Sequence, residues 1–304
     1  MDLSNRTKEL CKLYNIKPAR SKGQNFLIKE EIYDKIVVAA DLKNDDVVLE
    51  VGPGLGFLTA KLANKVKKVI AVELDDKLAE VLKTNLLAKG ITNVEVVNED
   101  IIKFSIFNFQ FSNNFQLLNF QYKVVANIPY NISSLLLRKF LSAEHKPTLM
   151  VLMLQKEVAE RITAVAGKMS LLAVSVQFYA SPEIIQIVSK ENFWPMSEVN
   201  SAIVRIIPRP TLPFARGGKI KAPLLAKEGD GGGYSEKEFF RLVKIGFSAR
   251  RKMLKNNLTN GYHVENEIAA NWLKQAGFNE KIRAQELSVE EWIKLFGVVK
   301  ENML

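Results

Sequence analysis

The sequence predicts an α/β protein in which helices cover both faces of a mostly parallel sheet, followed by a small all-α C-terminal domain. Short apolar runs alternate with helix-like segments from about residue 31 to residue 207. Strands buried on both faces of a parallel sheet have this kind of continuous apolar sequence. A stretch rich in glycine and proline then interrupts the alternation, and the residues after it have helical periodicity only.

The elements of the sheet domain are expected in a regular order along the chain. Apolar runs predict strands at residues 47–51, 68–72, 94–97, 123–126, 148–155, 183–188 and 202–207. Helical patterns between them predict helices at residues 31–42, 55–64, 75–89 and 133–141. Gly90 is a typical stop for the third of these helices.

The C-terminal helices are expected at residues 236–247, 249–258, 264–276 and 289–296. Ser235 and Glu238 have the spacing of a capping box, which predicts a helix start at this point. The expected domains are therefore a sheet domain at 1–210, a flexible linker at 211–233 and a basic helical domain at 234–304. Within the first, residues 104–121 look like an insertion, because 13 of these 18 residues are Phe, Asn or Gln and none is charged.

Composition limits the class of protein. The formal net charge of +10 over 304 residues favours a polyanionic partner, because neutralising phosphates releases condensed counterions. With Cys11 as its single cysteine, the chain has no disulfide framework, which is typical of a reducing compartment. The N-terminus lacks a secretory pattern, and no run of about 18 apolar residues predicts a membrane span. We therefore expect a cytoplasmic protein without a membrane segment, and the two histidines make a metal site improbable.

A glycine-rich turn between an apolar run and a helix start indicates a nucleotide site. The sequence VVLEVGPGLGFLT places Gly52, Gly54 and Gly56 where a tight turn lets a ligand approach the backbone. Glu73 follows Gly52 by 21 residues, at the end of the next expected strand. An acid at that position can accept hydrogen bonds from both hydroxyls of a ribose.

The same turn argues against a phosphorylated ligand. It contains no Lys or Arg and lacks the G-K-[ST] ending of a phosphate-binding loop. The turn therefore favours an adenosine that carries no phosphate. Asp100 follows the next expected strand, and a carboxylate there could accept a hydrogen bond from the adenine amine, although taken alone it is a common turn or cap residue.

The tetrapeptide Asn127-Ile128-Pro129-Tyr130 is the expected chemical centre. An aromatic amine is a poor nucleophile because its lone pair is delocalised into the ring. The Asn127 side-chain oxygen and a neighbouring backbone carbonyl can accept its two hydrogens and so free the lone pair for attack. Pro129 fixes its own φ and keeps Ile128 extended, and Tyr130 offers a ring on which a flipped base can stack. This chemistry requires no general base before the attack.

These motifs together resemble the KsgA/RsmA family, the small-subunit ribosomal RNA adenine dimethyltransferases. The matching runs are QNFL, EVGPGLGFLT, VELD, NED, NIPYNISS, LMLQKEVAERI, residues 193–205 and GFSARRKMLKNNL. The resemblance implies a class I methyltransferase fold of Rossmann type. It implies S-adenosylmethionine as the methyl donor, held by Asn25, Leu27, Gly52, Gly54, Glu73, Asp100 and Asn127. It also implies that Asn127, Tyr130 and Phe193 hold the target adenine.

The family implies transfer of two methyl groups to each of two adjacent adenosines near the 3′ end of 16S rRNA, during small-subunit biogenesis. No metal is implied, and we expect a monomer. The chain departs from the family pattern F-x-P-x-P-x-V-D-S at two positions, since Ser197 replaces a proline and Asn200 replaces an aspartate.

A basic segment close to the C-terminus is the expected RNA-binding surface. It has six cations and no acid within residues 241–258, which suits a track for phosphates on a helix pair. These cations are Arg241, Lys244, Arg250, Arg251, Lys252 and Lys255. Two alternatives share most of the motifs: a large-subunit (23S) rRNA adenine methyltransferase of the antibiotic-resistance type, and a non-catalytic RNA-binding assembly factor. A DNA adenine methyltransferase is a third, which the basic helical domain disfavours.

Overall fold

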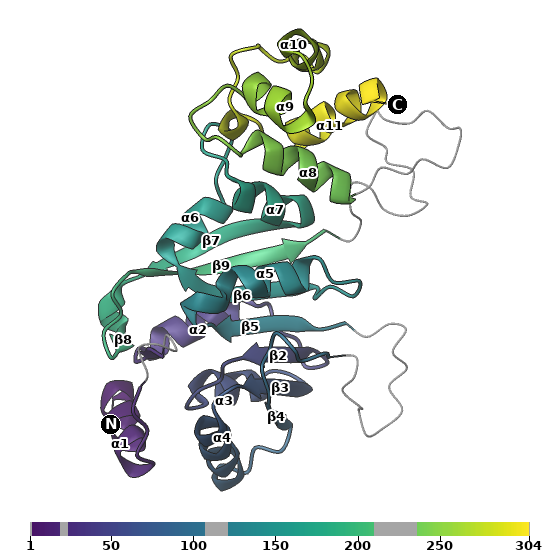
Figure 1. Ribbon diagram of the computed structural model, residues 1–304. Coiled ribbons are helices and arrows are strands. Elements are labelled where there is room, and N and C mark those ends of the chain that lie inside the picture. The colour runs from purple at the N-terminus through teal and green to yellow at the C-terminus, as the bar shows by residue number, and fades with distance from the viewer. Residues whose placement is uncertain (1, 19–23, 107–120, 210–235, 304) are drawn as a thin grey trace. The chain divides into compact units, whose positions relative to one another are not determined.

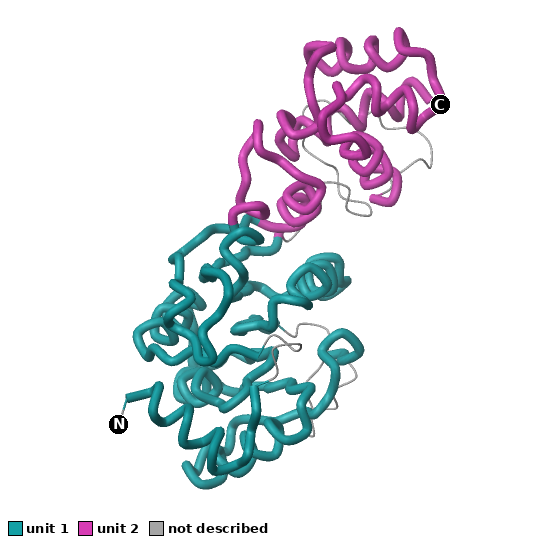
Figure 2. The backbone as a smooth tube through the Cα atoms, turned by 60° about the vertical axis from the view of Figure 1, so that its left-hand side comes forward, with its two compact units in different colours: residues 1–159, 181–208 teal, residues 160–180, 209–304 magenta. Residues whose placement is uncertain are grey.

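A computed structural model describes residues 2–18, 24–106, 121–209 and 236–303 (Figure 1). The chain divides into two compact units, residues 1–159 with 181–208 and residues 160–180 with 209–304 (Figure 2). Residues 160–180 therefore group with the C-terminal helices, whereas the sequence pattern put them in the sheet domain. The expected linker at 211–233 and residues 107–120 of the expected insertion lie outside the described residues.

The first unit is built on a seven-stranded sheet, counted over the described residues, with strand order β4-β3-β2-β5-β6-β9-β7. The strands are β2 (Val47–Val51), β3 (Lys68–Glu73), β4 (Val94–Asn98), β5 (Lys123–Asn127), β6 (Leu149–Gln155), β7 (Ala180–Val188) and β9 (Ser201–Pro208). The pairs from β4 to β6 are parallel, and β9 runs antiparallel to β6. The mostly parallel sheet expected from the apolar runs is confirmed.

The strand order reverses direction at β2, which has β3 on one side and β5 on the other. Val51 pairs with Val72, and Glu50 pairs with Val125, so the three strands end at the same edge. In open α/β sheets, ligands bind outside the carboxyl ends of the strands at this kind of switch point. The glycine turn after β2, Glu73 at the end of β3 and Asn127 at the end of β5 are thereby brought to one place.

Helices pack on the sheet through apolar side chains that are almost fully buried. They are α2 (Glu30–Ala39), α3 (Phe57–Ala63), α4 (Asp76–Ala88) and α5 (Ser133–Leu141). The helix α1 (Leu3–Leu13) precedes them in the chain, and its buried residues are Thr7 and Cys11. Ile36, Leu62 and Leu82 from three of these helices belong to one core cluster with the strand residues Val69 and Val125. The expected helices α2 to α5 agree with the structure to within a few residues. The helix α1 and a two-stranded antiparallel ribbon of β1 (Phe26–Leu27) with β8 (Phe193–Trp194) were not predicted.

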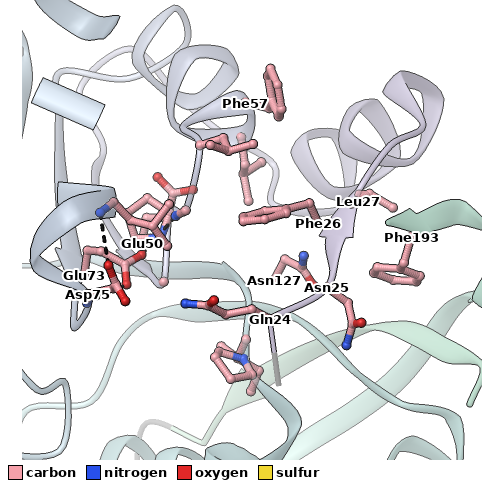
Figure 3. A pocket seen from close by; sticks show the side chains of 18 of the residues that line it. Gln24, Asn25, Phe26, Leu27, Glu50, Phe57, Glu73, Asp75, Asn127 and Phe193 are labelled. Atoms are coloured by element: carbon pink, nitrogen blue, oxygen red, sulfur yellow. Dashed lines mark hydrogen bonds between the residues drawn. The ribbon is translucent and has the colours of Figure 1, made fainter. Parts of the chain in front are cut away.

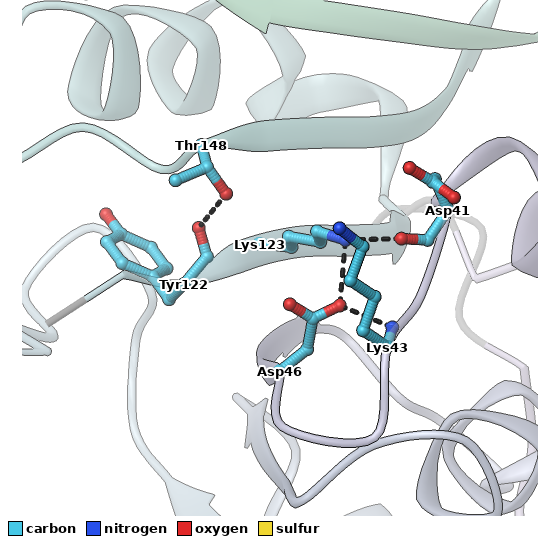
Figure 4. A network of polar contacts seen from close by, with 6 residues as sticks. All are labelled: Asp41, Lys43, Asp46, Tyr122, Lys123 and Thr148. Carbon is cyan, nitrogen blue, oxygen red and sulfur yellow. Dashed lines mark hydrogen bonds and ion pairs between the residues drawn. The ribbon is translucent and has the colours of Figure 1, made fainter.

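A polar network fixes the opposite edge of the sheet, where the strands begin (Figure 4). Lys123, the first residue of β5, donates to Asp46 Oδ2 at 2.7 Å and to the carbonyl of Asp41. The same Asp46 oxygen accepts the backbone N–H of Lys43 at 2.7 Å. The network ties the start of β5 to the turn before β2, so the two strands keep their register.

The second unit is helical and has an aromatic core. Its helices are α7 (Leu171–Tyr179), α8 (Glu236–Gly246), α9 (Leu254–Tyr262), α10 (Asn266–Gln275) and α11 (Val289–Met303), and α6 (Lys156–Ile162) crosses the unit boundary. Phe178 stacks on Phe239 with ring centroids 4.7 Å apart, and Phe239 meets Phe296 edge-on at 5.7 Å. Within the described ranges, no helix has the length and apolar character needed to cross a membrane.

Two expected helices were wrong in their bounds. The helix expected at 289–296 continues to Met303. The helix expected at 249–258 begins only at Leu254, and residues 247–253 connect it to α8. Asn257, which is 2% exposed, explains this geometry. Its side-chain amide donates to the carbonyls of Gly246 at 2.6 Å and Ala249 at 3.2 Å, so those carbonyls point back into the turn.

Candidate active site

The glycine turn after β2 uses backbone conformations that favour glycine. Gly52, Gly54 and Gly56 have φ values of 65°, 57° and 80°, all in the left-handed region. A Cβ on Gly54 would lie 3.3 Å from a ring carbon of Phe26. The turn therefore needs glycine at position 54 both for its backbone angle and for the close approach of the Phe26 ring.

Glu73 is fixed by the backbone around it. Its two carboxylate oxygens accept the N–H groups of Gly54 and Asp75, each at 3.0 Å. The side chain is buried, and burial is the main cause that raises the pKa of Glu73, while the two N–H groups oppose that shift. Because each oxygen has a further lone pair, the fixed carboxylate can still accept hydroxyl donors from a ligand.

Glu50 is a second buried acid at the same place, and it was not predicted as a site residue. Its side chain is 1% exposed, and its Oε2 has no hydrogen-bond partner in the described part of the chain. The pKa of Glu50 is raised to about 8, mainly by burial, and the charge of Glu73 contributes in the same direction. The one acid in the otherwise apolar run VVLEV could have identified it.

The segment after β5 forms the other side of the site. Asn127 ends β5, and Pro129 has φ −58° and ψ 132° before the short 3-10 helix Tyr130–Ile132. The Pro129 carbonyl accepts the N–H of Ile132 at 3.3 Å, and the Tyr130 carbonyl accepts the Ser133 hydroxyl at 3.0 Å. This local bonding holds the Tyr130 backbone in place at the cavity.

One cavity brings most of the predicted residues together (Figure 3). Asn127 lies between an acidic side with Glu50 and Glu73 and an aromatic side with Phe26 and Phe193. The predicted residues that line the cavity are Asn25, Leu27, Gly52, Gly54, Glu73, Asn127, Tyr130 and Phe193. Phe26 and Tyr33 also line it and were not predicted.

The ribbon of β1 and β8 explains how segments far apart in sequence meet at this cavity. Leu27 pairs with Phe193, and Phe26 pairs with Trp194. The N–H of Ile28 also donates to the Asn192 carbonyl at 2.9 Å. The expected donor residues near position 25 and the expected base-stacking Phe193 therefore belong to one small structural element.

Asp100 lies near this cavity but is not among the residues that line it. It follows β4, the strand in which Asn98 pairs with Glu73. Its Oδ1 accepts the N–H of Ile102 at 2.9 Å, which is the turn-forming role that its residue type commonly has. Lys139 holds the same loop by donating to the Ile102 carbonyl at 2.9 Å.

Both departures from the family pattern are accommodated by hydrogen bonds. The Ser197 hydroxyl donates to the Val199 carbonyl at 3.0 Å, and its side chain is buried. The Asn200 side-chain oxygen accepts the N–H of Lys190 at 3.1 Å, a bond that an aspartate could also accept. The loop between β8 and β9 is therefore held by side chains where the family pattern has a proline.

The six predicted RNA-binding cations all lie in the second unit, but in different settings. Arg241 and Lys244 are exposed on α8, and Lys255 is half-buried on α9 with its ammonium 3.2 Å from Glu280. Arg250, Arg251 and Lys252 are exposed in the turn between the two helices, which corrects the expectation of a track carried by a helix pair alone. Asn257 shapes this turn and was not predicted. The described residues contain no cluster of His, Cys, Asp or Glu suited to a metal ion.

Comparisons with known proteins show similarity to one enzyme family over most of the chain. Residues 16–216 match the family model for ribosomal RNA adenine dimethylase. A ribosomal RNA small subunit methyltransferase A from Dehalococcoides mccartyi is 42% identical over 289 residues, 95% of this chain and 90% of the relative. Another protein of that name, from Clostridioides difficile, is 35% identical over 98% of this chain and 96% of its own.

Two solved structures are similar over most of the chain. A dimethyladenosine transferase from Plasmodium falciparum has a TM-score of 0.68 and 29% identity, covering 90% of this chain and 96% of its own. The 23S rRNA methyltransferase ErmE also has a TM-score of 0.68, with 25% identity, and covers 91% of this chain and 100% of its own. The fold alone is thus equally similar to proteins named for different substrates.

Proposed function

The chain belongs to the ribosomal RNA adenine dimethylase family, and on this premise we propose that it transfers methyl groups from S-adenosylmethionine to the exocyclic amines of two adjacent adenosines near the 3′ end of 16S rRNA. The observation that supports this proposal is the shared cavity of Asn127, Tyr130, Glu73 and the glycine turn. Two relatives with 42% and 35% identity are named small-subunit methyltransferases. Their names favour a small-subunit substrate over the 23S alternative. Similarity of fold does not distinguish these two substrates.

The residues on the acidic side fit the adenosine part of the methyl donor. Glu73 would accept hydrogen bonds from the ribose hydroxyls, because its carboxylate is fixed and retains free lone pairs. The left-handed turn at Gly52 and Gly54 would let the donor lie against the backbone. Asn25, directly before β1, and Leu27 in β1 would close the cavity. Asp100, in the loop after β4, would accept a hydrogen bond from the adenine amine. The donor supplies an electrophilic methyl group on a positively charged sulfur.

The residues after β5 would present the amine of the target adenine. The Asn127 side-chain oxygen would accept one hydrogen, and the carbonyl of the neighbouring Ile128 would accept the other. The aromatic rings of Tyr130 and Phe193 would stack on the base. The amine nitrogen forms a bond to the methyl carbon, the electron pair of the carbon–sulfur bond stays on sulfur, and the methylated nitrogen then releases a proton to water.

The helical unit would bind the RNA backbone. Five of the six predicted cations are exposed, and three of them project from one turn that Asn257 holds. Phosphate contacts of this kind position a protein without reading sequence, so selection of the target adenosine is assigned to the cavity and to RNA shape. We also propose that the protein acts as a cytoplasmic monomer during biogenesis of the small ribosomal subunit.

Asn127→Ala tests this proposal. We expect it to abolish transfer of tritiated methyl groups to unmethylated small-subunit particles and to leave RNA binding nearly unchanged. Asn131→Ala is the matched control, because Asn131 has the same chemistry in the same segment but is exposed. Mass spectrometry of the rRNA identifies the product. Label in 23S rRNA alone would support the large-subunit alternative, and equal turnover by Asn127→Ala and the wild type would refute the role of Asn127.

A further inference from the structure

The phenol group of Tyr130 meets two buried hydroxyl groups. Its oxygen lies 2.6 Å from Ser201 Oγ and 3.4 Å from Ser197 Oγ. Ser201 is 0% exposed and Ser197 is 3% exposed. The polar end of this ring is therefore bonded inside the protein, chiefly to Ser201, and the ring cannot change its position without breaking that bond.

Ser201 is well placed to hold the ring. It begins β9 and pairs with Gln155 of β6, so the sheet fixes its backbone. The Ser197 hydrogen is used on the Val199 carbonyl, so toward Tyr130 this hydroxyl can only accept. The other end of Tyr130 is held by the Ser133 hydroxyl at its carbonyl. The residue is thus held at its backbone and at its phenol end, and the partner at the phenol end comes from a strand 71 residues away.

We propose that Ser201 is a positioning residue that holds the Tyr130 ring for the second of the two methyl transfers to one adenosine. The inference rests on the proposed function. Before the first transfer the amine has two hydrogens, which the Asn127 and Ile128 oxygens can both accept. After the first transfer and loss of a proton, the amine has one hydrogen and one methyl group, so one of these two bonds is lost. Orientation of the base then depends more on the stacking rings, one of which Ser201 holds.

The second transfer forms the same bonds as the first. The lone pair that the nitrogen regained on losing its proton attacks a methyl group on a second molecule of donor, the electron pair of the broken carbon–sulfur bond stays on sulfur, and the last amine hydrogen leaves as a proton to water. Ser201 contacts neither reactant in this scheme and acts through Tyr130. Loss of its hydroxyl should therefore slow the second transfer more than the first, by about two- to ten-fold, the factor that corresponds to one hydrogen bond.

The test uses the full-length protein with unmethylated small-subunit particles under single-turnover conditions. Mass spectrometry of the nucleosides gives the rates at which monomethyl- and dimethyladenosine form. For Ser201→Ala we expect monomethyladenosine to accumulate, with an unchanged calorimetric Kd for S-adenosylhomocysteine. A wild-type protein that methylates no adenosine would refute the proposed function itself. If the wild type forms dimethyladenosine and Ser201→Ala gives the same product ratio, only the inference about Ser201 is overturned.

Two further variants separate positioning from general stability. Asn93→Ala is the control, because Asn93 donates to the carbonyls of Ala63 and Val66 at the end of the sheet where β4 begins. It should lower the melting temperature without changing the product ratio.

Tyr130→Phe removes the same hydrogen bond from the other side, so it should shift the product ratio as Ser201→Ala does. The double variant should shift the ratio little further than either single variant. Additive effects of the two substitutions would contradict the inference. If Ser201→Ala does not fold, a wild-type ratio of monomethyl- to dimethyladenosine in Tyr130→Phe would contradict it instead.

Discussion

Replacing Gly54 by alanine should weaken donor binding as well as the fold. At φ 57°, an alanine costs about 1–2 kcal/mol of conformational energy. The new Cβ would lie 3.3 Å from the Phe26 ring, so the ring or the turn must shift by a few tenths of an ångström. That shift disturbs the bond from the Gly54 N–H to Glu73, which is 3.0 Å long.

The expected loss of affinity follows from that bond. A hydrogen bond to a charged group has a net value of about 1.5–3 kcal/mol. Losing about 1.4 kcal/mol would weaken binding about tenfold. Titration calorimetry with S-adenosylhomocysteine measures this directly, because it needs neither RNA nor turnover.

Gly90→Ala is the matched control for backbone strain. Gly90 has φ 66°, and a Cβ there would meet no atom within 4 Å. Gly90→Ala should therefore lose thermal stability through backbone strain and keep its affinity, whereas Gly54→Ala should lose both. Wild-type affinity in Gly54→Ala, or an equal loss in Gly90→Ala, would refute the reasoning.

Two other outcomes are expected. Asn257→Ala removes two hydrogen bonds that hold the turn with Arg250, so it should destabilise the protein by about 1–3 kcal/mol. RNA binding should become weaker and less dependent on salt, while the affinity for S-adenosylhomocysteine stays unchanged. Unchanged RNA affinity in filter binding would contradict this expectation. Glu50→Gln should flatten the pH dependence of stability, because the folded pKa of about 8 lies above the ordinary value of 4.5 for this side chain. The folded state then binds more protons than the unfolded state, so wild-type stability should fall as pH rises from about 4.5 to 8. Denaturant unfolding across this range checks it, and equal slopes for variant and wild type would count against a buried neutral Glu50.

The local elements of the site could be predicted because short stretches of sequence determine them. The glycine turn at Gly54 needs left-handed backbone angles, and Pro129 fixes its own φ and restricts Ile128 before it. Alternation of apolar runs and helical patterns located the strands β2, β3 and β5 to within about a residue. Parallel strands end at one edge, so Glu73 and Asn127 could be expected at the same edge, but the strand order that places β3 and β5 on either side of β2 was shown only by the structure.

Contacts between distant segments were decided only by the tertiary structure. The bond from Tyr130 to Ser201, the ribbon that pairs Leu27 with Phe193, and the burial of Glu50 beside Glu73 all depend on strand register and packing. The turn at 247–253 interrupts a segment of good helical pattern because a buried amide from Asn257 competes for its carbonyls. Sequence periodicity reports short-range preference along the chain, whereas these features arise from side chains whose neighbours exist only once the sheet and the helices have packed.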